Sequence, residues 1–263
     1  MKTLLIDADS LLYKAGSAGT ARQCEQEIDN IVALLQVCGG KPEKTLLFVE
    51  SEVHKRCFRH ELAKTKPYKG NRKPNSPRPA LYQYARDYVA ANYRVIYSTP
   101  DLESDDMVAI EAAKLSPEEV VIGYIDKDLL QLPYLLINYQ KWGLLPADRL
   151  RAHLALWHQV LMGDTADNVP GCPGVGKVAA ARILKDAIEG SDDWTEDEVV
   201  QKLYVDVKCE YLMRGCMEEM FTEQFALLFL EGGLAANYTD YLTKYSVRTP
   251  DKPLKIKKQK VTK

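Results

Sequence analysis

The segment TLLID, residues 3–7, is a short apolar run that ends at an acidic residue. Similar apolar runs recur in KTLLFVE (44–50), RVIYS (94–98) and EVVIGYID (119–126). Runs of this length are typical of buried strands, and helical patterns alternate with them, at 21–38, 52–64, 79–92 and 104–114. This alternation predicts an α/β fold with a mostly parallel central sheet flanked by helices. In such sheets ligands bind beyond the carboxyl ends of the strands, where Asp7, Glu50 and Asp126 fall.

The second half of the chain has a different pattern. From about residue 148, helical segments such as DRLRAHLALWHQVLMG and VGKVAAARILKDAIEG follow one another without strands. We therefore predict an α/β domain over 1–147, a helical region over 148–250 and a basic tail over 251–263.

The composition is that of an ordinary globular protein. The 263 residues can bury a sizeable core, and 46% of them are hydrophobic and 27% charged. No apolar run is long enough to span a bilayer and no leader precedes the first strand, so we expect an intracellular protein without a membrane partner. The six cysteines form no CxxC pair and the four histidines lack the spacing of zinc ligands, which favours reduced, structural cysteines.

The net charge of −2 hides a segregation of basic residues. The segment KTKPYKGNRKPNSPRP, residues 64–79, contains four prolines and six basic residues, and hardly any aliphatic side chain. Such a segment cannot form core, so we predict a loop or arch that stands over another part of the molecule. An ordinary solvated basic loop is the alternative.

Acidic residues cluster at the ends of several predicted elements. Glu103, Asp105 and Asp106 open a predicted helix, where acids in the first turn also serve as caps. Asp126 and Asp128 lie across the end of a strand. If the strand geometry persists, both carboxylates point the same way, as a shared cation requires; a turn with Asx capping is the alternative.

Asp164 and Asp167 lie at i and i+3, on one face of a helical turn, or form a cap. The joint pattern favours a cation site, because so many like charges at one edge of a sheet would otherwise repel. The acids concerned are Asp7, Glu50, Glu103, Asp105, Asp106, Asp126, Asp128, Asp164 and Asp167. Carboxylates without softer ligands select Mg²⁺ or Mn²⁺, and two such ions form the usual clamp for phosphodiester hydrolysis, so the pattern suggests a nuclease.

The segment GDTADNVPGCPGVGK, residues 163–177, joins the last acids to a glycine-rich turn and the start of a helix. Gly174, Val175, Gly176 and Lys177 would let backbone amides, a helix N-terminus and a lysine charge hold a phosphate. Such a site grips DNA by its backbone without reading bases. A plain helix-connecting turn uses the same glycines.

Five motifs in this order resemble the 5′-nuclease superfamily, which includes flap endonucleases, the 5′-nuclease domain of bacterial DNA polymerase I and phage 5′-to-3′ exonucleases. They are LLIDADSLLY, FRHEL with YKGNR, LESDDMVA, IDKDLLQL and GDTADNVPGCPGVGKVAAARIL, and they cover roughly residues 1–187. No polymerase domain follows, so the sequence is similar to the stand-alone, phage-type enzymes. The resemblance implies a PIN-like fold with a helical arch at about 64–79 and a helix-hairpin-helix-like motif at about 170–186.

The resemblance also implies roles for the acids. Asp7, Glu103 and Asp105 resemble the ligands of a first metal ion, with Asp106 close by. The group that resembles the ligands of a second ion consists of Asp126, Asp128, Asp164 and Asp167.

Two acids depart from the family pattern. Glu50 stands where the family usually has Asp, and its longer side chain could still reach a cation. Asp9 is an additional acid, and we expect it to cap the helix that starts at Ser10.

In the arch, the resemblance implies that Lys69 and Arg72 contact the scissile phosphate and stabilise its developing charge. Tyr68 would stack on a terminal base, and Lys66 and Lys73 would add contacts to the DNA. The prolines suggest an arch that is partly unfolded until DNA threads through it. The hairpin is implied to hold the downstream duplex, with a K⁺ ion bound by carbonyl oxygens of its turn.

These features together predict a 5′-to-3′ exonuclease and flap endonuclease, dependent on two Mg²⁺ or Mn²⁺ ions, acting on DNA duplex ends, nicks and 5′ flaps in replication or recombination. We expect a monomer in the cytoplasm, that of the host cell if the chain is phage-encoded, with replication proteins as partners. One alternative is a primer-removing enzyme that acts on RNA–DNA hybrids, although nothing in the sequence reads a 2′-hydroxyl. A non-catalytic DNA-binding homologue is less consistent with the complete set of acids.

Overall fold

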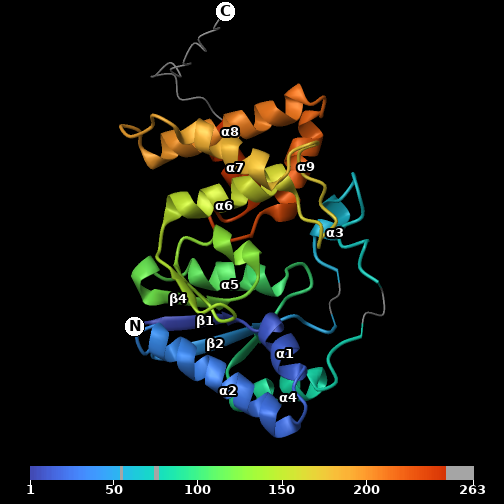
Figure 1. Ribbon diagram of the computed structural model, residues 1–263, viewed down its shortest axis with the longest axis vertical. Helices are drawn as coiled ribbons and strands as arrows, with labels where there is room; N and C mark the ends of the chain where they lie inside the picture. Colours follow the sequence, from blue (N-terminus) through green and yellow to red (C-terminus); the bar gives the residue numbers. More distant parts are fainter. Residues whose placement is uncertain (54–55, 74–76, 247–263) are drawn as a thin grey trace, which may run out of the picture.

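In the computed structural model, which describes residues 1–53, 56–73 and 77–246, a six-stranded sheet organises the first half of the chain (Figure 1). The strand order is β3-β2-β1-β4-β5-β6, and all neighbours are parallel except β5 and β6. The bounds are Thr3–Asp7 for β1, Lys44–Val49 for β2, Val95–Tyr97 for β3, Val120–Tyr124 for β4, Leu135–Asn138 for β5 and Gly143–Leu145 for β6. The predicted, mostly parallel α/β sheet is confirmed.

Side chains alternate across the sheet, so each face has its own apolar core. Leu4 and Ile6 of β1 pack with α1, α2 and α4, whereas Leu5 packs with α5 on the opposite face. The bounds of these helices are Asp9–Gly16 for α1, Ala21–Cys38 for α2, Tyr82–Asn92 for α4 and Ser104–Ala112 for α5. Helices on both faces leave the carboxyl ends of the parallel strands as the place for a site.

One predicted helix is largely absent. Among the described residues of 52–64, the expected helix is reduced to α3, Arg59–Leu62. Amides on either side of α3 bond to distant parts of the chain instead: Phe58 N donates to the Asp101 carbonyl and Thr65 N to the Glu223 carboxylate. The sequence pattern also does not reveal β5 and β6, which are only four and three residues long.

The second half is helical, as predicted, and Figure 1 shows α6 to α9 stacked beyond the sheet, in yellow to red. Its core centres on Trp157, which is fully buried against the rings of Phe221, Phe225 and Tyr241. The base of the arch joins this core through Tyr68. The bounds are Arg149–Met162 for α6, Lys177–Ile188 for α7, Glu196–Met213 for α8, Glu218–Leu228 for α9 and Tyr238–Ser246 for α10.

Several general expectations can be compared with this fold. All six cysteines are free thiols. Within the described ranges, no helix has the length and apolar character needed to cross a membrane. The predicted basic tail, 251–263, lies outside the described residues, as do residues 74–76 of the arch.

Candidate metal centre

The predicted acids gather at the carboxyl edge of the sheet. Asp7 is the last residue of β1, Glu50 follows β2, and Asp126 comes two residues after β4. Glu103 is the N-cap of α5 and forms a capping box with Asp106, so the capping alternative is correct in this segment and the cation site stays a prediction. The parallel strands and one helix start thus bring acids from distant parts of the sequence to one edge.

Three aspartates form the tightest group. One carboxylate oxygen from each of Asp128, Asp164 and Asp167 lies within 4.8 Å of the other two. Asp164 and Asp167 are buried, and Lys127 Nζ is 2.9 Å from Asp164 Oδ2. A donor set of carboxylate oxygens without nitrogen or sulfur suits a hard divalent cation such as Mg²⁺ or Mn²⁺.

The backbone brings these aspartates together in a different way from the prediction. Asp126 is the N-cap of a short 3₁₀ turn, Lys127–Gln131, and its Oδ1 accepts from Asp128 N at 3.0 Å. The strand therefore does not continue to Asp128, and the Asx-turn alternative is correct. Asp164 pairs with Val169 in an isolated antiparallel bridge, so the predicted helical turn through Asp164 is wrong.

Two glycines shape the loop that carries Asp164 and Asp167. Gly163 and Gly171 have φ values of +76° and +70°, which L side chains rarely adopt. A Cβ added at Gly171 would lie 2.3 Å from the backbone nitrogen of Gly163, so the two backbones approach too closely for any side chain. The acidic loop depends on both glycines.

Gly171→Ala should therefore lower the free energy of unfolding by about 2 kcal/mol or more. It should also weaken divalent-ion binding, because the backbone must shift beneath both aspartates. Urea denaturation and Mn²⁺ titration measure the two effects. Gly143→Ala is the matched control, since no atom lies within 4 Å of its added Cβ. A Gly171→Ala protein with unchanged stability would contradict this role of the loop.

Without cations the centre holds unfavourable charge. Burial, followed by the neighbouring carboxylates, raises the pKa of Asp7 and of Asp105 well above the usual range. The same causes raise the pKa of Asp128 to about 7. Repulsion among buried carboxylates is the physical reason to expect a cation here.

This charge predicts an unusual pH dependence. Asp7, Asp105 and Asp128 bind their protons more tightly in the folded chain than in the unfolded chain. The free energy of unfolding of the metal-free protein should therefore fall as the pH rises from the usual carboxyl range to about 7. Glu103 has the opposite sign, but its pKa is lowered to about 2, so its contribution is lost only in more acidic solution. Thermal melts in EDTA between about pH 5 and about pH 8 measure the slope.

Divalent ions should reverse this trend. Because a metal ion displaces protons from the carboxylates, its affinity should rise about tenfold per pH unit for each proton released, up to about pH 7. Mg²⁺ should therefore raise the melting temperature more at about pH 8 than at about pH 5. A melting temperature in EDTA that rises steadily over this range would contradict the described electrostatics.

The basic arch lies directly against these acids. Lys69 N donates to the Asp167 carbonyl at 2.9 Å, and the Arg72 guanidinium donates to Asp167 Oδ1 at 2.6 Å. Lys69 Nζ forms an ion pair with Glu103. Although burial opposes the shift, the charges of Lys69 and Arg59 lower the pKa of Glu103 to about 2. The structure thus places Lys69 and Arg72 beside the acids.

Tyr68 does not occupy the predicted position. Its side chain is 5% exposed, and its hydroxyl is 2.8 Å from both Glu103 Oε2 and Asp167 Oδ2. Since the ring is buried, it offers no face to a terminal base, and the stacking role is corrected to a role in ordering two acids. Lys66 and Lys73 are exposed on the same segment.

The arch is also less regular than the resemblance implies. Its described residues, 64–73 and 77–79, contain no helix. Its amides bond elsewhere, since Lys64 N and Thr65 N donate to Glu223 Oε1 at 2.7 and 2.8 Å. The prolines of the arch also disfavour a helix, because proline has no backbone N–H to donate.

Asp106 is corrected as a candidate metal ligand. It is fully buried, and Oδ1 accepts from Arg59 Nη2 at 2.7 Å and from Glu231 N at 3.0 Å. Oδ2 accepts from Arg59 Nη1 at 2.6 Å and from Glu103 N at 3.1 Å. These four hydrogen bonds use the acceptor sites of the carboxylate, so none is left for a cation.

Asp9 and Glu50 tie elements together at the same edge. The expected cap at Asp9 is absent, because Asp9 Oδ2 accepts from Glu50 N at 2.8 Å and from Ser104 Oγ at 2.9 Å. Glu50 Oε2 accepts from Ser104 N at 3.0 Å. Burial, with the charge of Asp9, raises the pKa of Glu50 to about 7. Both acids join the end of β2 to the start of α5.

The glycine-rich turn leads from the acidic loop into α7. Gly174 has a φ of +71° and is exposed, and Gly176 is the N-cap of α7 without a side-chain cap. Lys177 is exposed at the first position of that helix. Val175 differs from the prediction, because its side chain is 6% exposed and its amide donates to the Cys172 carbonyl at 3.1 Å. Val175 therefore supports the turn and offers no donor to a phosphate.

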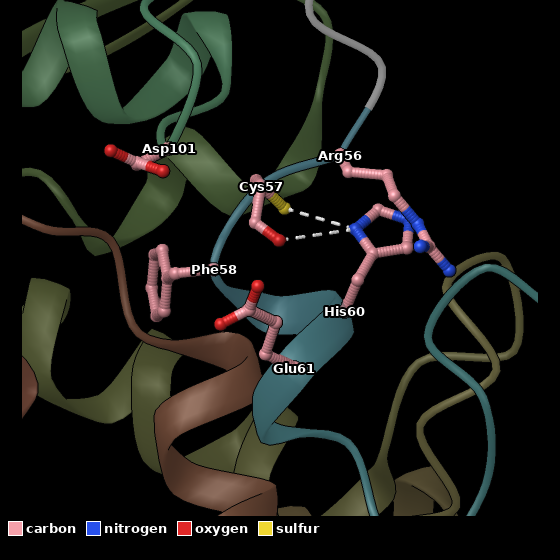
Figure 2. Close-up of a pocket in the computed structure, with 6 residues that line it drawn as sticks. All are labelled: Arg56, Cys57, Phe58, His60, Glu61 and Asp101. Carbon is pink, nitrogen blue, oxygen red and sulfur yellow. Dashed lines mark hydrogen bonds between the residues drawn. The ribbon is translucent and has the colours of Figure 1, made fainter.

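A second group of ionisable side chains lines a cavity of about 140 Å³ beside α3 (Figure 2). His60 Nδ1 lies 3.5 Å from Cys57 Sγ and 3.3 Å from the Cys57 carbonyl oxygen. Burial, with the charge of Glu103, raises the pKa of the Cys57 thiol to about 11, so this sulfur stays protonated at neutral pH. The pair is thus unsuited to nucleophilic catalysis, and the acidic edge remains the candidate site.

The fold and site are those of an α/β protein with a candidate divalent-cation site, formed by buried carboxylates at the carboxyl edge of a mostly parallel sheet and faced by lysine and arginine. The chain belongs to the 5′-3′ exonuclease family, because the model of its N-terminal resolvase-like domain matches residues 2–139. A 5′-3′ exonuclease from Buchnera aphidicola subsp. Baizongia pistaciae (strain Bp) is 30% identical over 207 residues, which are 69% of this chain and 65% of that protein.

Other similar proteins are longer. DNA polymerase I of Bacillus caldotenax is 29% identical over 206 residues, which are 70% of this chain but 23% of the polymerase. The chain thus spans about a quarter of that relative's length.

Solved structures share the fold at lower identity. The T5 5′-exonuclease with bound divalent metal ions (zinc) aligns with a TM-score of 0.55 and 17% identity over 93% of this chain and 100% of that chain. The bacteriophage T5 flap endonuclease in a pseudo-enzyme-product complex with DNA and metal ions aligns with a TM-score of 0.53 and 15% identity over 94% of this chain and 100% of that chain. This likeness supports the fold assignment across both halves of the chain.

Proposed function

We propose that this protein is a metal-dependent phosphodiesterase that removes nucleotides from the 5′ ends of duplex DNA and cuts 5′ flaps. The observation that carries the proposal is the convergence of Asp128, Asp164 and Asp167 within 4.8 Å, beside Lys69 and Arg72. Membership of the 5′-3′ exonuclease family supports it, as do fold neighbours whose structures contain DNA and metal ions.

Two Mg²⁺ or Mn²⁺ ions fit the acidic edge. Asp128, Asp164 and Asp167 would hold one ion, with Asp126 beside them. Asp7, Glu103 and Asp105 would hold the other, with Glu50 contributing to the charge of the same edge. Ions bound in this way supply a strong nucleophile at neutral pH and stabilise charge on the leaving oxygen.

The arch would add the positive charge of two side chains to that of the metal ions. Lys69 and Arg72 already lie beside Glu103 and Asp167, so a phosphate bound at the acids would lie within their reach. Fixed cations aimed at a developing negative charge lower the barrier because they need no reorganisation during the reaction. Lys66 and Lys73 would bind the DNA backbone on the exposed side of the arch.

The helical region would hold the duplex. Gly174, Gly176 and Lys177 present an exposed turn, an uncapped helix start and a lysine to a phosphate, and the carbonyls of the turn are the proposed K⁺ ligands. We assign the nuclease domain with its arch to 1–147 and duplex binding to 148–250, including the hairpin at about 170–186. The second region also supplies Asp164 and Asp167 to the metal centre. Such binding reads shape and phosphates, so affinity should fall steeply with salt.

A cleavage time course tests the proposal. DNA carrying a 5′ flap, and a duplex with a recessed end, would each be labelled and incubated with the wild-type protein in Mg²⁺ or in EDTA. Cleavage near the junction or the 5′ end, only with Mg²⁺, is the expected result. Matched RNA–DNA hybrid ends in the same assay would show whether hybrids are preferred. Binding without cleavage of any substrate in Mg²⁺ or Mn²⁺ would replace the proposal with a non-catalytic DNA-binding role.

A further inference from the structure

Arg59 is a buried cation that contacts Glu103 at the acidic edge. Its side chain is 2% exposed, and it lies in α3, which precedes the arch in the sequence and packs against α9. An arginine carries five N–H donors in a fixed planar fork, and a buried one must satisfy all of them. The partners of Arg59 therefore show what this side chain organises.

All five donors of Arg59 have an acceptor. Nη1 donates to Asp106 at 2.6 Å and to Glu103 Oε2 at 3.2 Å. Nη2 donates to Asp106 at 2.7 Å and to the Phe229 carbonyl at 2.7 Å, and Nε donates to the Leu227 carbonyl at 3.2 Å. One side chain thus joins α3 and α5 to the end of α9 and the residues that follow it.

Asp106 completes this unit. It holds Arg59 in a two-pronged ion pair, and its remaining acceptor sites bind the amides of Glu103 and Glu231. The unit is therefore saturated with hydrogen bonds and does not exchange partners with a metal ion or with DNA. Two bonds lead from the unit to carboxylates of the acidic edge: Arg59 Nη1 donates to Glu103 Oε2, and the Asp106 amide donates to Asp105 Oδ1 at 2.8 Å.

The geometry points to Arg59 as a positioning residue that holds the Glu103 carboxylate in place for a divalent ion. The inference rests on the proposed function and extends it, because it explains how Glu103 stays fixed among like charges. Lys69 contacts Glu103 Oε1 from the arch side, whereas Arg59 contacts Oε2 from the buried side. Arg59 also makes this position depend on the packing of α9, through the Leu227 and Phe229 carbonyls.

The test must separate positioning from folding, because Arg59→Met alone would leave Asp106 buried and unpaired. The paired variant Arg59→Met/Asp106→Leu replaces the ion pair with apolar side chains of similar size, so no buried charge is left unpaired. The readout is the Mn²⁺ affinity of the full chain, by calorimetric titration, at a temperature where each variant is folded. The control is Tyr241→Phe, which removes a buried hydrogen bond to His153 and keeps the ring that packs against Phe229.

The paired variant leaves the Leu227 and Phe229 carbonyls and two amides without these partners, so it should melt below the wild type. In the folded state it should bind Mn²⁺ at least about tenfold more weakly. In cleavage assays the Mg²⁺ concentration for half-maximal rate should rise, whereas the DNA concentration for half-maximal rate should not. Tyr241→Phe should lower the melting temperature and leave the Mn²⁺ affinity unchanged.

If the paired variant fails to fold, Arg59→Lys carries the test. A lysine keeps the charge but has three donors and no planar fork, so it should also weaken Mn²⁺ binding about tenfold. Wild-type Mn²⁺ affinity in whichever variant folds would overturn the positioning role of Arg59. Absence of Mn²⁺ binding in the wild type would instead overturn the proposed function, so the two failures are distinguishable.

Discussion

Asp128→Asn should reduce DNA cleavage by about a hundredfold or more while the metal-free protein becomes at least as stable as the wild type. Asp128 offers one of the three converging oxygens, and an amide is a much poorer ligand for a hard cation. The same change removes a charge that burial and neighbouring aspartates disfavour, since they raise the pKa of Asp128 to about 7. Asparagine also keeps the carbonyl oxygen that can accept the hydrogen bond from Gln159.

Single-turnover cleavage and thermal melts in EDTA at about pH 8 measure the two effects of Asp128→Asn. Asp148→Asn is the control, because Asp148 caps α6 through Arg151 N and asparagine is an equally good cap. The control should leave both quantities unchanged. Asp128→Asn protein that cleaves at close to the wild-type rate would remove Asp128 from the metal centre.

Lys69→Ala should lower the cleavage rate at saturating DNA by about a hundredfold to a thousandfold. Lys69 is fixed in the site by its backbone, which has a φ of +54° and donates from N to the Asp167 carbonyl. Its ammonium group lies against Glu103 and 4.0 Å from Asp167, where a phosphate bound by the acids would lie within reach. Loss of this charge should therefore act on the reaction rather than on DNA affinity.

Lys66→Ala provides the comparison, because Lys66 is exposed on the same segment. It should weaken DNA binding modestly and leave the rate at saturating DNA close to that of the wild type. Single-turnover rates and equilibrium binding in Ca²⁺ would separate the two effects. A Lys69→Ala protein that loses affinity but keeps its rate would assign Lys69 to binding instead.

The sequence pattern predicts the sheet well and the helix over 52–64 poorly. A strand such as TLLID can be recognised from the sequence alone, because a buried parallel strand is a continuous apolar run. The residues on either side of α3 follow no such local pattern, since the Phe58 amide bonds to Asp101 and the Lys64 and Thr65 amides bond to Glu223, far away in the chain. Local patterns do not contain those contacts.

The acids of the candidate site were easier to find than the residues that position them. Asp7, Glu50 and Asp126 follow from the rule that ligands bind at the carboxyl ends of parallel strands, and the other acids from their clustering at the ends of predicted elements. Arg59 does not, because its carbonyl partners lie 168 and 170 residues away in the sequence. The sequence shows only an arginine in the motif FRHEL, and this does not indicate whether the side chain is buried with several partners or exposed at the surface.

Asp106 shows why neighbouring acids can have different roles. Asp105 and Asp106 are adjacent in the sequence, yet Asp106 turns toward Arg59 and has no acceptor site left. Asp105 has no such cation bonded to it among the described contacts, and burial raises its pKa well above the usual range. Which of two adjacent carboxylates is free depends on the tertiary partner, which the sequence alone does not provide.

The measurement that tests the metal centre most directly is anomalous diffraction from crystals of the protein grown with Mn²⁺. The account predicts one anomalous peak in contact with Asp128, Asp164 and Asp167 and a second in contact with Asp7, Glu103 and Asp105, with none at Asp106. Crystals of protein that cleaves DNA in Mn²⁺, but that show no Mn²⁺ at these carboxylates, would contradict it.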